Sequence, residues 1–529
     1  MFKVMIRDNM SPVAKEILEE TGKIDVTIDF DKKTSDPEVL SEIIGEYDAL
    51  AIRSGTKVTE AVLQKAKNLK VIGRAGIGVD NIDVRAATNH GIVVMNAPGG
   101  NTVTTGEHAI SLMLALARNI PQGTASLREA KWEKKQLIGV EITGKTLGIM
   151  GLGNIGRVVA ERAIGLKMRV IAADPFVSEE AAKALKVELV SIEDLYKRSD
   201  FITLHVPRLK ETMNMINASA LSQMKPGVRL INCSRGEVVN LEDLDKAIND
   251  GHVAGAALDV FPKEPPDSSL SILKNPNVIM TPHLGASTGE AQSKVAEMIG
   301  RQISDYLINE TIIHAVNFPP VSKEEMEQLR PYIDLGEKMG SLMSQMERNI
   351  HDITINYCGK LTNFATKPIT HSILKGYLDS FTDMPVNYVS APSIASGKGI
   401  HVKEIFSESK DDFSGLIKIK LEGCEEGPDQ IWGTIFGKKY PRIVRLGKIF
   451  MDAIPDGWMI VIQNIDRPGV IGNVGSTLGK HDINIGRFQL GRLENRALCM
   501  VNIDEPAGEH VLDEIRKLPN ILKVCQVRM

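Results

Sequence analysis

Three residues of complementary chemistry stand near the ends of three apolar segments in the middle of the chain. Arg235 follows RLINCS, Glu264 lies in GAALDVFPKEPP, and His283 follows VIMTP. An arginine can bind a carboxylate and polarise a developing carbonyl, and a histidine can take up a hydroxyl proton. A glutamate beside the histidine would fix one imidazole tautomer and raise the imidazole pKa. The combination predicts a catalytic set for hydride transfer at a hydroxyl-bearing carbon.

Each of these residues also has an ordinary interpretation when it is taken alone. A histidine after a proline can be a turn residue bonded to backbone, and Glu264 lies in a proline-flanked loop where a solvated acid is common. The three together favour chemistry over that alternative. Neighbouring Cys233 is interpreted as a small buried hydrophobe, and His205 as a residue that packs near the cofactor.

A glycine pattern typical of dinucleotide binding precedes this set. In KTLGIMGLGNIGRVVAERAI, Gly151, Gly153 and Gly156 follow an apolar strand and open a helical pattern, the context in which G-x-G-x-x-G is informative. The glycines would permit a tight turn, the approach of a pyrophosphate and close helix packing. Asp174 ends the next strand, where a carboxylate can bind a ribose diol and would repel a 2′-phosphate, so the sequence favours NAD over NADP. The alternative is an ordinary glycine-rich turn with a surface aspartate. The residues expected to line the cofactor site are Gly151, Gly153, Asn154, Ile155, Gly156, Asp174, Cys233, Arg235, Asp259, His283 and Gly285.

Two series of alternating strands and helices must position these residues. The first runs to about residue 97 and the second begins near Lys145, and such alternation predicts parallel sheets covered by helices. Ligands gather at the carboxyl ends of strands in such sheets. Between the two series, the stretch from Ala109 to Ala117 is apolar on most faces, which predicts a helix buried between domains or at a subunit contact.

Composition limits the classes of protein that the chain can represent. Its 529 residues suggest roughly three or four domains, and 43% hydrophobic with 25% charged residues is typical of a globular protein in water. A net charge of −4 argues against nucleic-acid or anionic-membrane binding. Neither a membrane-spanning run nor a signal peptide is expected, so the location predicted is cytoplasmic. The cysteines are expected to be reduced thiols without metal-ligand spacing: Cys233, Cys358, Cys424, Cys499 and Cys525.

The motifs resemble those of the D-2-hydroxyacid dehydrogenase family, and within it the long-form members that act on D-3-phosphoglycerate. The phrases that carry the resemblance are IRSGTKVT, RAGIGVDNID, GKTLGIMGLGNIGR, NCSRGEVV, GAALDVFPKEPP and TPHLGAST. The resemblance assigns Arg235, Glu264 and His283 the roles argued above. It also implies substrate contacts, although the two arginines among them could instead be solvated cations at strand ends. These residues are Arg53, Ser54, Arg74, Gly76 and Asn101.

The resemblance also implies a fold of four parts, which belongs to the α/β class. We expect a discontinuous, flavodoxin-like substrate domain, a Rossmann NAD domain, an α+β intervening domain and a ferredoxin-like ACT domain. The proline pair Pro319–Pro320 suggests the third boundary, and the order strand, helix, strand, strand, helix, strand suggests the last domain. The expected spans are 1–97 with 285–318, 98–284, 319–454 and 455–529, respectively.

The C-terminal part carries a candidate effector site. NIDRPGVIGNVGSTLGKHDINIGRF resembles the ACT signature, and family ACT domains pair side by side and hold an amino acid between them. The positions that match that site are Asn464, Asp466 and Asn484, and L-serine is the expected ligand. The alternative is that Asp466 only caps a strand-to-helix turn.

The resemblance implies an enzyme that oxidises D-3-phosphoglycerate to 3-phosphohydroxypyruvate with NAD, the first step of L-serine biosynthesis, with serine feedback. It implies a homo-oligomer, either a dimer or a tetramer. Two alternatives stay open at this point. One is a dehydrogenase for another D-2-hydroxy acid, and the other is a non-catalytic relative that senses NAD(H).

Overall fold

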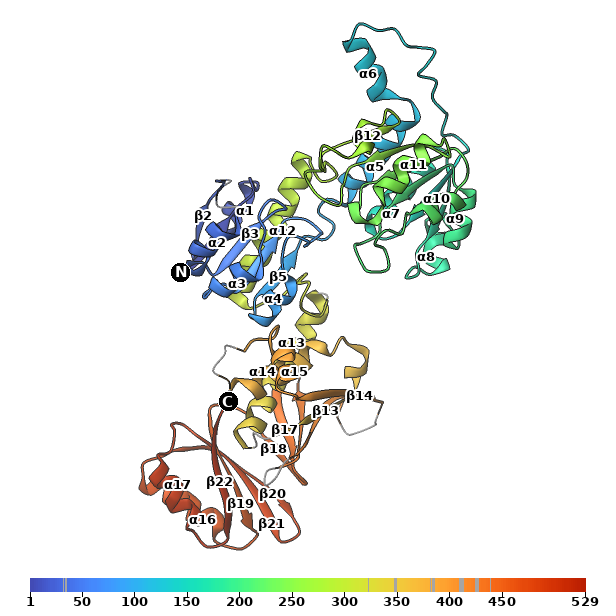
Figure 1. Cartoon of the computed structure of the whole chain (residues 1–529). Coiled ribbons are helices and arrows are strands. Elements are labelled where there is room, and N and C mark those ends of the chain that lie inside the picture. Colours follow the sequence, from blue (N-terminus) through green and yellow to red (C-terminus); the bar gives the residue numbers. More distant parts are fainter. Residues whose placement is uncertain are drawn as a thin grey trace.

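Figure 1 shows the computed structural model of the chain, in which the described residues form four sheets in succession. The structure describes residues 1–31, 33, 36–321, 323–346, 350–380, 382, 386–408, 413–423, 428–437 and 439–529. Cys424 lies outside these residues, whereas Cys233, Cys358 and Cys499 carry free, buried thiols. Within the described residues, none of the helices is both long and apolar enough to cross a membrane.

The first sheet is parallel and has the order β2-β1-β3-β4-β5, which is the flavodoxin-like order. Its strands are β1 (Phe2–Ile6), β2 (Ile24–Ile28), β3 (Ala49–Ile52), β4 (Val71–Arg74) and β5 (Val93–Asn96). Its helices are α1 (Val13–Glu19), α2 (Pro37–Ile43), α3 (Glu60–Lys65), α4 (Val84–Asn89) and the distant α12 (Gly289–Asn309). The chain returns to this sheet through α12. Its residues Ile299 and Ile303 pack so closely on Gly73 of β4 that they occupy the space a side chain there would need.

The second sheet is also parallel and has the order β12-β11-β10-β9-β6-β7-β8. Its strands are β6 (Thr146–Met150), β7 (Arg169–Ala173), β8 (Glu188–Leu189), β9 (Phe201–Leu204), β10 (Val228–Asn232), β11 (Val253–Leu258) and β12 (Val278–Met280). Its helices are α5 (Thr102–Ala117), α6 (Ile120–Arg128), α7 (Asn154–Gly165), α8 (Glu179–Ala184), α9 (Ile192–Arg198), α10 (Ala218–Gln223) and α11 (Leu241–Asn249). The order reverses beside β6, as in a Rossmann fold, so the expected α/β class is confirmed. Helix α5 is buried along much of its length, whereas α6 projects from the body (Figure 1).

The third and fourth sheets contain the C-terminal part. The third is mixed, with the order β14-β13-β15-β16-β17-β18. Its elements are α13 (Lys323–Met346), β13 (Asp352–Gly359), α14 (Lys367–Asp379), α15 (Ala391–Gly397), β14 (His401–Ser407), β15 (Gly415–Glu422), β16 (Gln430–Phe436), β17 (Tyr440–Leu446) and β18 (Ile449–Ala453). The fourth is antiparallel, with the order β20-β21-β19-β22. Its elements are β19 (Trp458–Ile465), α16 (Val470–Lys480), β20 (Ile485–Leu493), β21 (Arg496–Ile503), α17 (Glu509–Arg516) and β22 (Ile521–Arg528).

The fourth sheet buries both of its faces, which follows from the alternation of side chains along its strands. On one face, Ile460 and Ile462 pack against α16 and α17. On the other face, Met459 and Val461 share a hydrophobic cluster with Met339 of α13. The last two sheets therefore form one packed unit around a common core.

Candidate active site

The glycine loop after β6 has the shape that a dinucleotide phosphate requires. Gly151 has φ +91°, and a Cβ there would lie 2.6 Å from the carbonyl oxygen of His205. A Cβ on Gly156 would lie 2.1 Å from the carbonyl oxygen of Gly151, so only glycine lets α7 approach the strand this closely. Gly153, by contrast, faces open space at the start of α7. The loop leaves room for a pyrophosphate at a helix N-terminus, so the residues present fit NAD.

Asp174 follows β7 and connects the glycine loop to the next turn. Its Oδ2 accepts a hydrogen bond from the Leu152 N–H at 2.8 Å, and its Oδ1 accepts one from the Phe176 N–H at 2.8 Å. A carboxylate offers about four acceptor sites, so both oxygens can still bind ribose hydroxyls. The neighbouring Pro175 and Phe176 are exposed and carry no charge. This arrangement suits a ribose diol better than a 2′-phosphate.

His283 and Glu264 form a close pair beyond β11 and β12. Nδ1 of His283 lies 2.7 Å from Oε2 of Glu264, and Oε1 of Glu264 accepts a hydrogen bond from the Phe261 N–H at 3.1 Å. Because an ionised carboxylate only accepts hydrogen bonds, Nδ1 carries the proton and Nε2 is left for a substrate. The hydrogen bond to Glu264 raises the pKa of His283. Partial burial alone would raise the pKa of Glu264, but the contact with His283 holds it below its usual value.

Asp259, at the end of β11, anchors the loop that carries His283. Its side chain is fully buried and accepts hydrogen bonds from the N–H groups of Leu284 (2.7 Å) and Gly285 (2.9 Å) and from the Thr281 hydroxyl (2.6 Å). Its backbone carbonyl accepts a hydrogen bond from the His283 N–H at 2.9 Å. From the sequence, Asp259 is expected among the cofactor contacts. In the structure its bonds hold the turn in which His283 adopts φ +56°.

His108 on α5 is a site residue that the sequence argument missed. Its Nε2 lies 3.2 Å from Oδ1 of Asp259 and 3.2 Å from the Thr281 hydroxyl. His108, Cys233 and Asp259 are close enough together to be considered as metal ligands. However, burial raises the pKa of the Cys233 thiol, and both Asp259 oxygens already accept backbone hydrogen bonds. A polar anchor accounts for these contacts. The phrase GEHAIS gave no signal for it, because the partner lies far along the chain.

The loop with Arg53 and Ser54 follows β3 and is held from two sides. Asp8 accepts hydrogen bonds from the N–H groups of Arg53 (2.8 Å) and Thr56 (3.0 Å) and from the Thr56 hydroxyl (2.7 Å). The Asn81 amide donates to the carbonyl oxygens of Arg53 (2.8 Å) and Thr56 (2.7 Å). These contacts fix the backbone of the loop, while Ser54 remains exposed.

Arg74 and Gly76 lie together at the end of β4. Nη1 of Arg74 lies 1.7 Å from the position of a Cβ on Gly76, so the guanidinium occupies the space a side chain would need. Burial, and then the charge of Arg235, lower the pKa of Arg74 to about 10. Arg53 contributes to the same effect, so the structure brings the three arginines into electrostatic range of one another. Oδ1 of Asn101, at the start of α5, is buried without a hydrogen-bond partner among the described residues and is available to a ligand.

The structure does not bring the three expected effector residues together within one chain. Asp466 follows β19 at the end where Ile465 pairs with Arg496, whereas Asn484 precedes β20 at the end where Ile485 pairs with Ile503. The length of these strands separates the two by roughly 20 Å. Asn464 is buried and donates to the carbonyl oxygen of Ile465. The role of Asn464 in binding an amino acid between two ACT domains stays a prediction.

Comparison with known proteins agrees with this architecture. Residues 110–285 match the NAD-binding domain of D-isomer specific 2-hydroxyacid dehydrogenases, residues 328–447 the D-3-phosphoglycerate dehydrogenase intervening domain, and residues 458–520 the ACT domain. Among solved structures, TT0316 protein from Thermus thermophilus has a TM-score of 0.55 and 30% identity, with 59% of this chain and 99% of that chain covered. D-lactate dehydrogenase from Aquifex aeolicus, complexed with NAD and lactic acid, has a TM-score of 0.52 and 26% identity, with 60% and 99% covered.

Curated relatives match the whole length of the chain. D-3-phosphoglycerate dehydrogenase from Synechocystis sp. is 41% identical and covers 100% of this chain and 95% of its own. The protein of the same name from Archaeoglobus fulgidus is 40% identical, with 100% of both chains covered. That from Bacillus subtilis is 39% identical, with 99% of both covered. The chain therefore belongs to the family of NAD-dependent D-3-phosphoglycerate dehydrogenases.

Proposed function

We propose that this protein oxidises D-3-phosphoglycerate to 3-phosphohydroxypyruvate with NAD, as the first step of L-serine biosynthesis. The observation that carries the proposal is the His283–Glu264 pair at 2.7 Å, which leaves Nε2 of the imidazole for the substrate, within electrostatic range of Arg235. NAD, when bound, supplies the hydride acceptor. The hydride leaves C2 of the substrate, and Nε2 of His283 takes the hydroxyl proton, so that a ketone forms and charge balances.

Different arginines would bind the two anionic ends of the substrate, its carboxylate and its phosphate. The charge of Arg235 acts on His283, so Arg235 would hold the carboxylate and polarise the forming carbonyl. Arg53 follows β3, and Arg74 is the last residue of β4. Both would meet the phosphate together with Ser54 and the backbone of Gly76. Asn101 offers a buried acceptor that suits a substrate hydroxyl.

The test is an NADH-linked assay with a panel of 2-keto acids. Reduction of 3-phosphohydroxypyruvate should exceed that of pyruvate, glyoxylate and hydroxypyruvate in kcat/KM. A higher kcat/KM for an unphosphorylated acid would assign the protein another D-2-hydroxy acid. Absence of turnover with every acid, together with tight NADH binding, would indicate a non-catalytic sensor.

We also propose that L-serine inhibits the enzyme by binding between two ACT domains. Asp466 and Asn484 stand at opposite ends of one sheet, and a twofold pairing of two copies places one end of a domain beside the other end of its partner. Asp466 could then bind the ammonium group while Asn484 of the second copy binds the carboxylate or hydroxyl. Calorimetry with L-serine and an inhibition curve test this, and D-serine serves as the control ligand.

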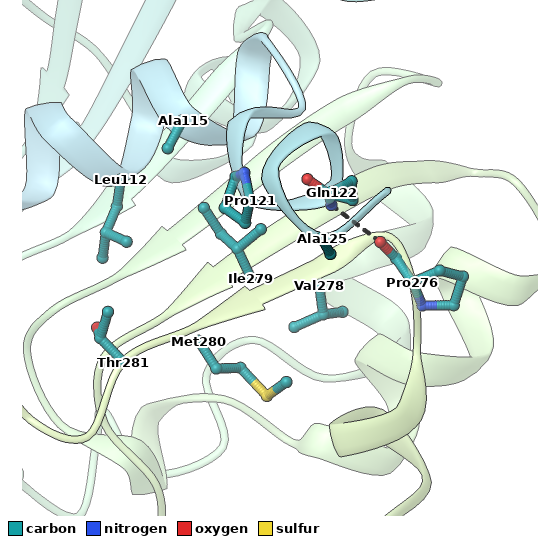
Figure 2. A pocket seen from close by; sticks show the side chains of 10 residues that line it. All are labelled: Leu112, Ala115, Pro121, Gln122, Ala125, Pro276, Val278, Ile279, Met280 and Thr281. Atoms are coloured by element: carbon teal, nitrogen blue, oxygen red, sulfur yellow. Dashed lines mark hydrogen bonds between the residues drawn. The ribbon is translucent and has the colours of Figure 1, made fainter. Parts of the chain in front are cut away.

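A homo-oligomer, dimer or tetramer, belongs to the same proposal. Helix α6 and the segment after it project from the body (Figure 1). The side chains of Leu127, Trp132 and Ile138 in this part of the chain are exposed. Below this arm is an apolar hollow of about 320 Å³ between α5, α6 and β12. Figure 2 shows its lining, in which the Gln122 amide donates to the Pro276 carbonyl oxygen at 3.0 Å. Such apolar surface suits a second copy. Light scattering after gel filtration measures the oligomeric state. We also propose that the protein is located in the cytoplasm.

A further inference from the structure

An ion pair joins the first two sheet units at the centre of the site. Asp80 lies in the loop after β4 of the first unit, and Arg235 follows β10 of the second. Nε of Arg235 lies 3.0 Å from Oδ2 of Asp80, and Nη1 of Arg235 donates to the carbonyl oxygen of Ser234 at 2.8 Å. Two of the three guanidinium nitrogens are thus held by protein groups. The remaining Nη2 has no hydrogen-bond partner among the described residues.

The loop that carries Asp80 is shaped to receive this guanidinium. A Cβ on Gly78 would lie 2.0 Å from Nη2 of Arg235 and 2.8 Å from Oδ2 of Asp80. Gly78 is not among the glycines with positive φ, so space for Arg235, rather than backbone conformation, requires glycine there. The same loop accommodates Arg74 at Gly76. The phrase RAGIGVDN therefore provides two places for arginine side chains, and the carboxylate that binds one of them.

Electrostatics give the carboxylate a second effect. The positive charge of Arg235 lowers the pKa of the buried Arg74, and the negative charge of Asp80 opposes this. A site that collects cations for an anionic substrate must hold them close together before the substrate arrives. A carboxylate bound at Nε of Arg235 offsets that repulsion, and Nη2 keeps a second N–H that points away from Nε and can bind the substrate.

We propose that Asp80 is a positioning residue for the reaction: it holds Arg235 by Nε and so turns Nη2 toward the carboxylate of the substrate. The inference rests on the proposed function, because it assumes that Arg235 binds a 2-hydroxy or 2-keto acid. Because Asp80 belongs to the first sheet unit and Arg235 to the second, the orientation of Arg235 also depends on how the two units lie relative to each other.

The pair is half-exposed, with side-chain exposures of 29% for Arg235 and 47% for Asp80. Such a pair contributes little to folding stability, so its loss should change rate and binding and leave Tm nearly unchanged. A misoriented guanidinium should cost about tenfold to a hundredfold in kcat/KM, the range for a lost charge-assisted hydrogen bond. Most of the loss should appear in kcat, because Arg235 acts on the developing carbonyl as well as on the bound substrate.

The experiment is a double-mutant cycle with Asp80→Ala and Arg235→Ala, read by kcat/KM for 3-phosphohydroxypyruvate and by calorimetric binding of oxalate to the NADH-bound enzyme. In the parent enzyme, Asp80→Ala should lower kcat/KM and weaken oxalate binding. When Arg235 is already alanine, Asp80→Ala should change kcat/KM and the oxalate affinity by no more than about twofold. Asp80→Asn, which retains an acceptor for Nε, should fall between the parent enzyme and Asp80→Ala. Asp25→Asn, at an exposed position of the edge strand β2, is the control for loss of one negative charge and should match the parent enzyme.

Gly78→Ala supplies an independent variant that keeps Asp80 but fills the space of Nη2. It should lower kcat/KM in the same direction as Asp80→Ala. Equal effects of Asp80→Ala with and without Arg235 would overturn the inference, as would parent-like kinetics of Asp80→Ala. If the parent enzyme reduces no keto acid, the proposed function fails, and the oxalate cycle still decides whether Asp80 acts through Arg235.

Discussion

The substitution His283→Ala tests the central chemical assignment most directly. The imidazole is held at Nδ1 by Glu264 at 2.7 Å, and its backbone N–H is held by the Asp259 carbonyl oxygen at 2.9 Å. An acid–base group positioned in this way contributes about 10²–10⁴-fold to the rate. At about 1.36 kcal/mol per tenfold change, this corresponds to about 3–5 kcal/mol of transition-state stabilisation. We expect kcat to fall by that factor.

The assay is NADH oxidation by 3-phosphohydroxypyruvate, followed at 25 °C over a range of keto-acid concentrations. NADH binding, measured by fluorescence, should stay within about twofold of the parent enzyme, because the glycine loop and Asp174 follow other strands, β6 and β7. His401→Ala, on exposed β14 of the third sheet, provides a histidine control. A kcat for His283→Ala within threefold of the parent value would refute the assignment of His283 as the proton donor and acceptor.

The substitution Glu264→Gln tests how Glu264 affects the pH dependence of the reduction and oxidation rates. The hydrogen bond to Glu264 raises the pKa of His283, and a neutral glutamine removes that effect. Reduction needs the protonated imidazole, so its rate falls as pH rises through the pKa of His283. Oxidation needs the neutral imidazole and rises through the same pKa. Both limbs should therefore move to lower pH in Glu264→Gln, and an unchanged midpoint would contradict the coupling.

The remaining predictions concern the cofactor and the effector. Reduction should be at least tenfold more efficient with NADH than with NADPH, and Asp174→Ala should narrow that ratio, measured as kcat/KM for each cofactor. Asp466→Ala should weaken serine inhibition about tenfold or more in an IC50 measurement and keep uninhibited kcat within about twofold. Serine should raise KM for the keto acid in the full-length enzyme and leave the dissociation constant of NADH, read by fluorescence, nearly unchanged.

The parts of the site that could be predicted from sequence are those whose cause is local. The glycine loop is one: the close contacts at Gly151 and Gly156 come from residues of the same strand–helix turn or from the adjacent strand end. The His283–Glu264 pair was predicted from two strand ends that parallel pairing brings side by side. The burial of Asn464 could also be predicted from the sequence. It lies two and four residues after Ile462 and Ile460, and alternation along a strand places all three on the helix-covered face.

The contacts that could not be predicted join segments far apart in the chain. Asp80 meets Arg235 only because two separately folded sheets face each other, and no local pattern encodes that arrangement. The same applies to His108 and Asp259, which join α5 to the end of β11. Similarly, Asp466 and Asn484 were grouped by motif, although strand register places them at opposite ends of a sheet.

The division of the site between two units indicates how an effector could act at a distance. The His283–Glu264 pair and the glycine loop belong wholly to the second unit, so relative movement of the units leaves them intact. The Asp80–Arg235 pair spans both units, so a relative movement of the units acts directly on it. The C-terminal part contacts the first unit, where the Ser393 hydroxyl donates to Asn89 at 2.8 Å and the Asn387 amide donates to the Gly91 carbonyl oxygen. A serine-induced change in the ACT pairing that reaches the first unit would therefore act on substrate binding and on Arg235, and spare NADH binding.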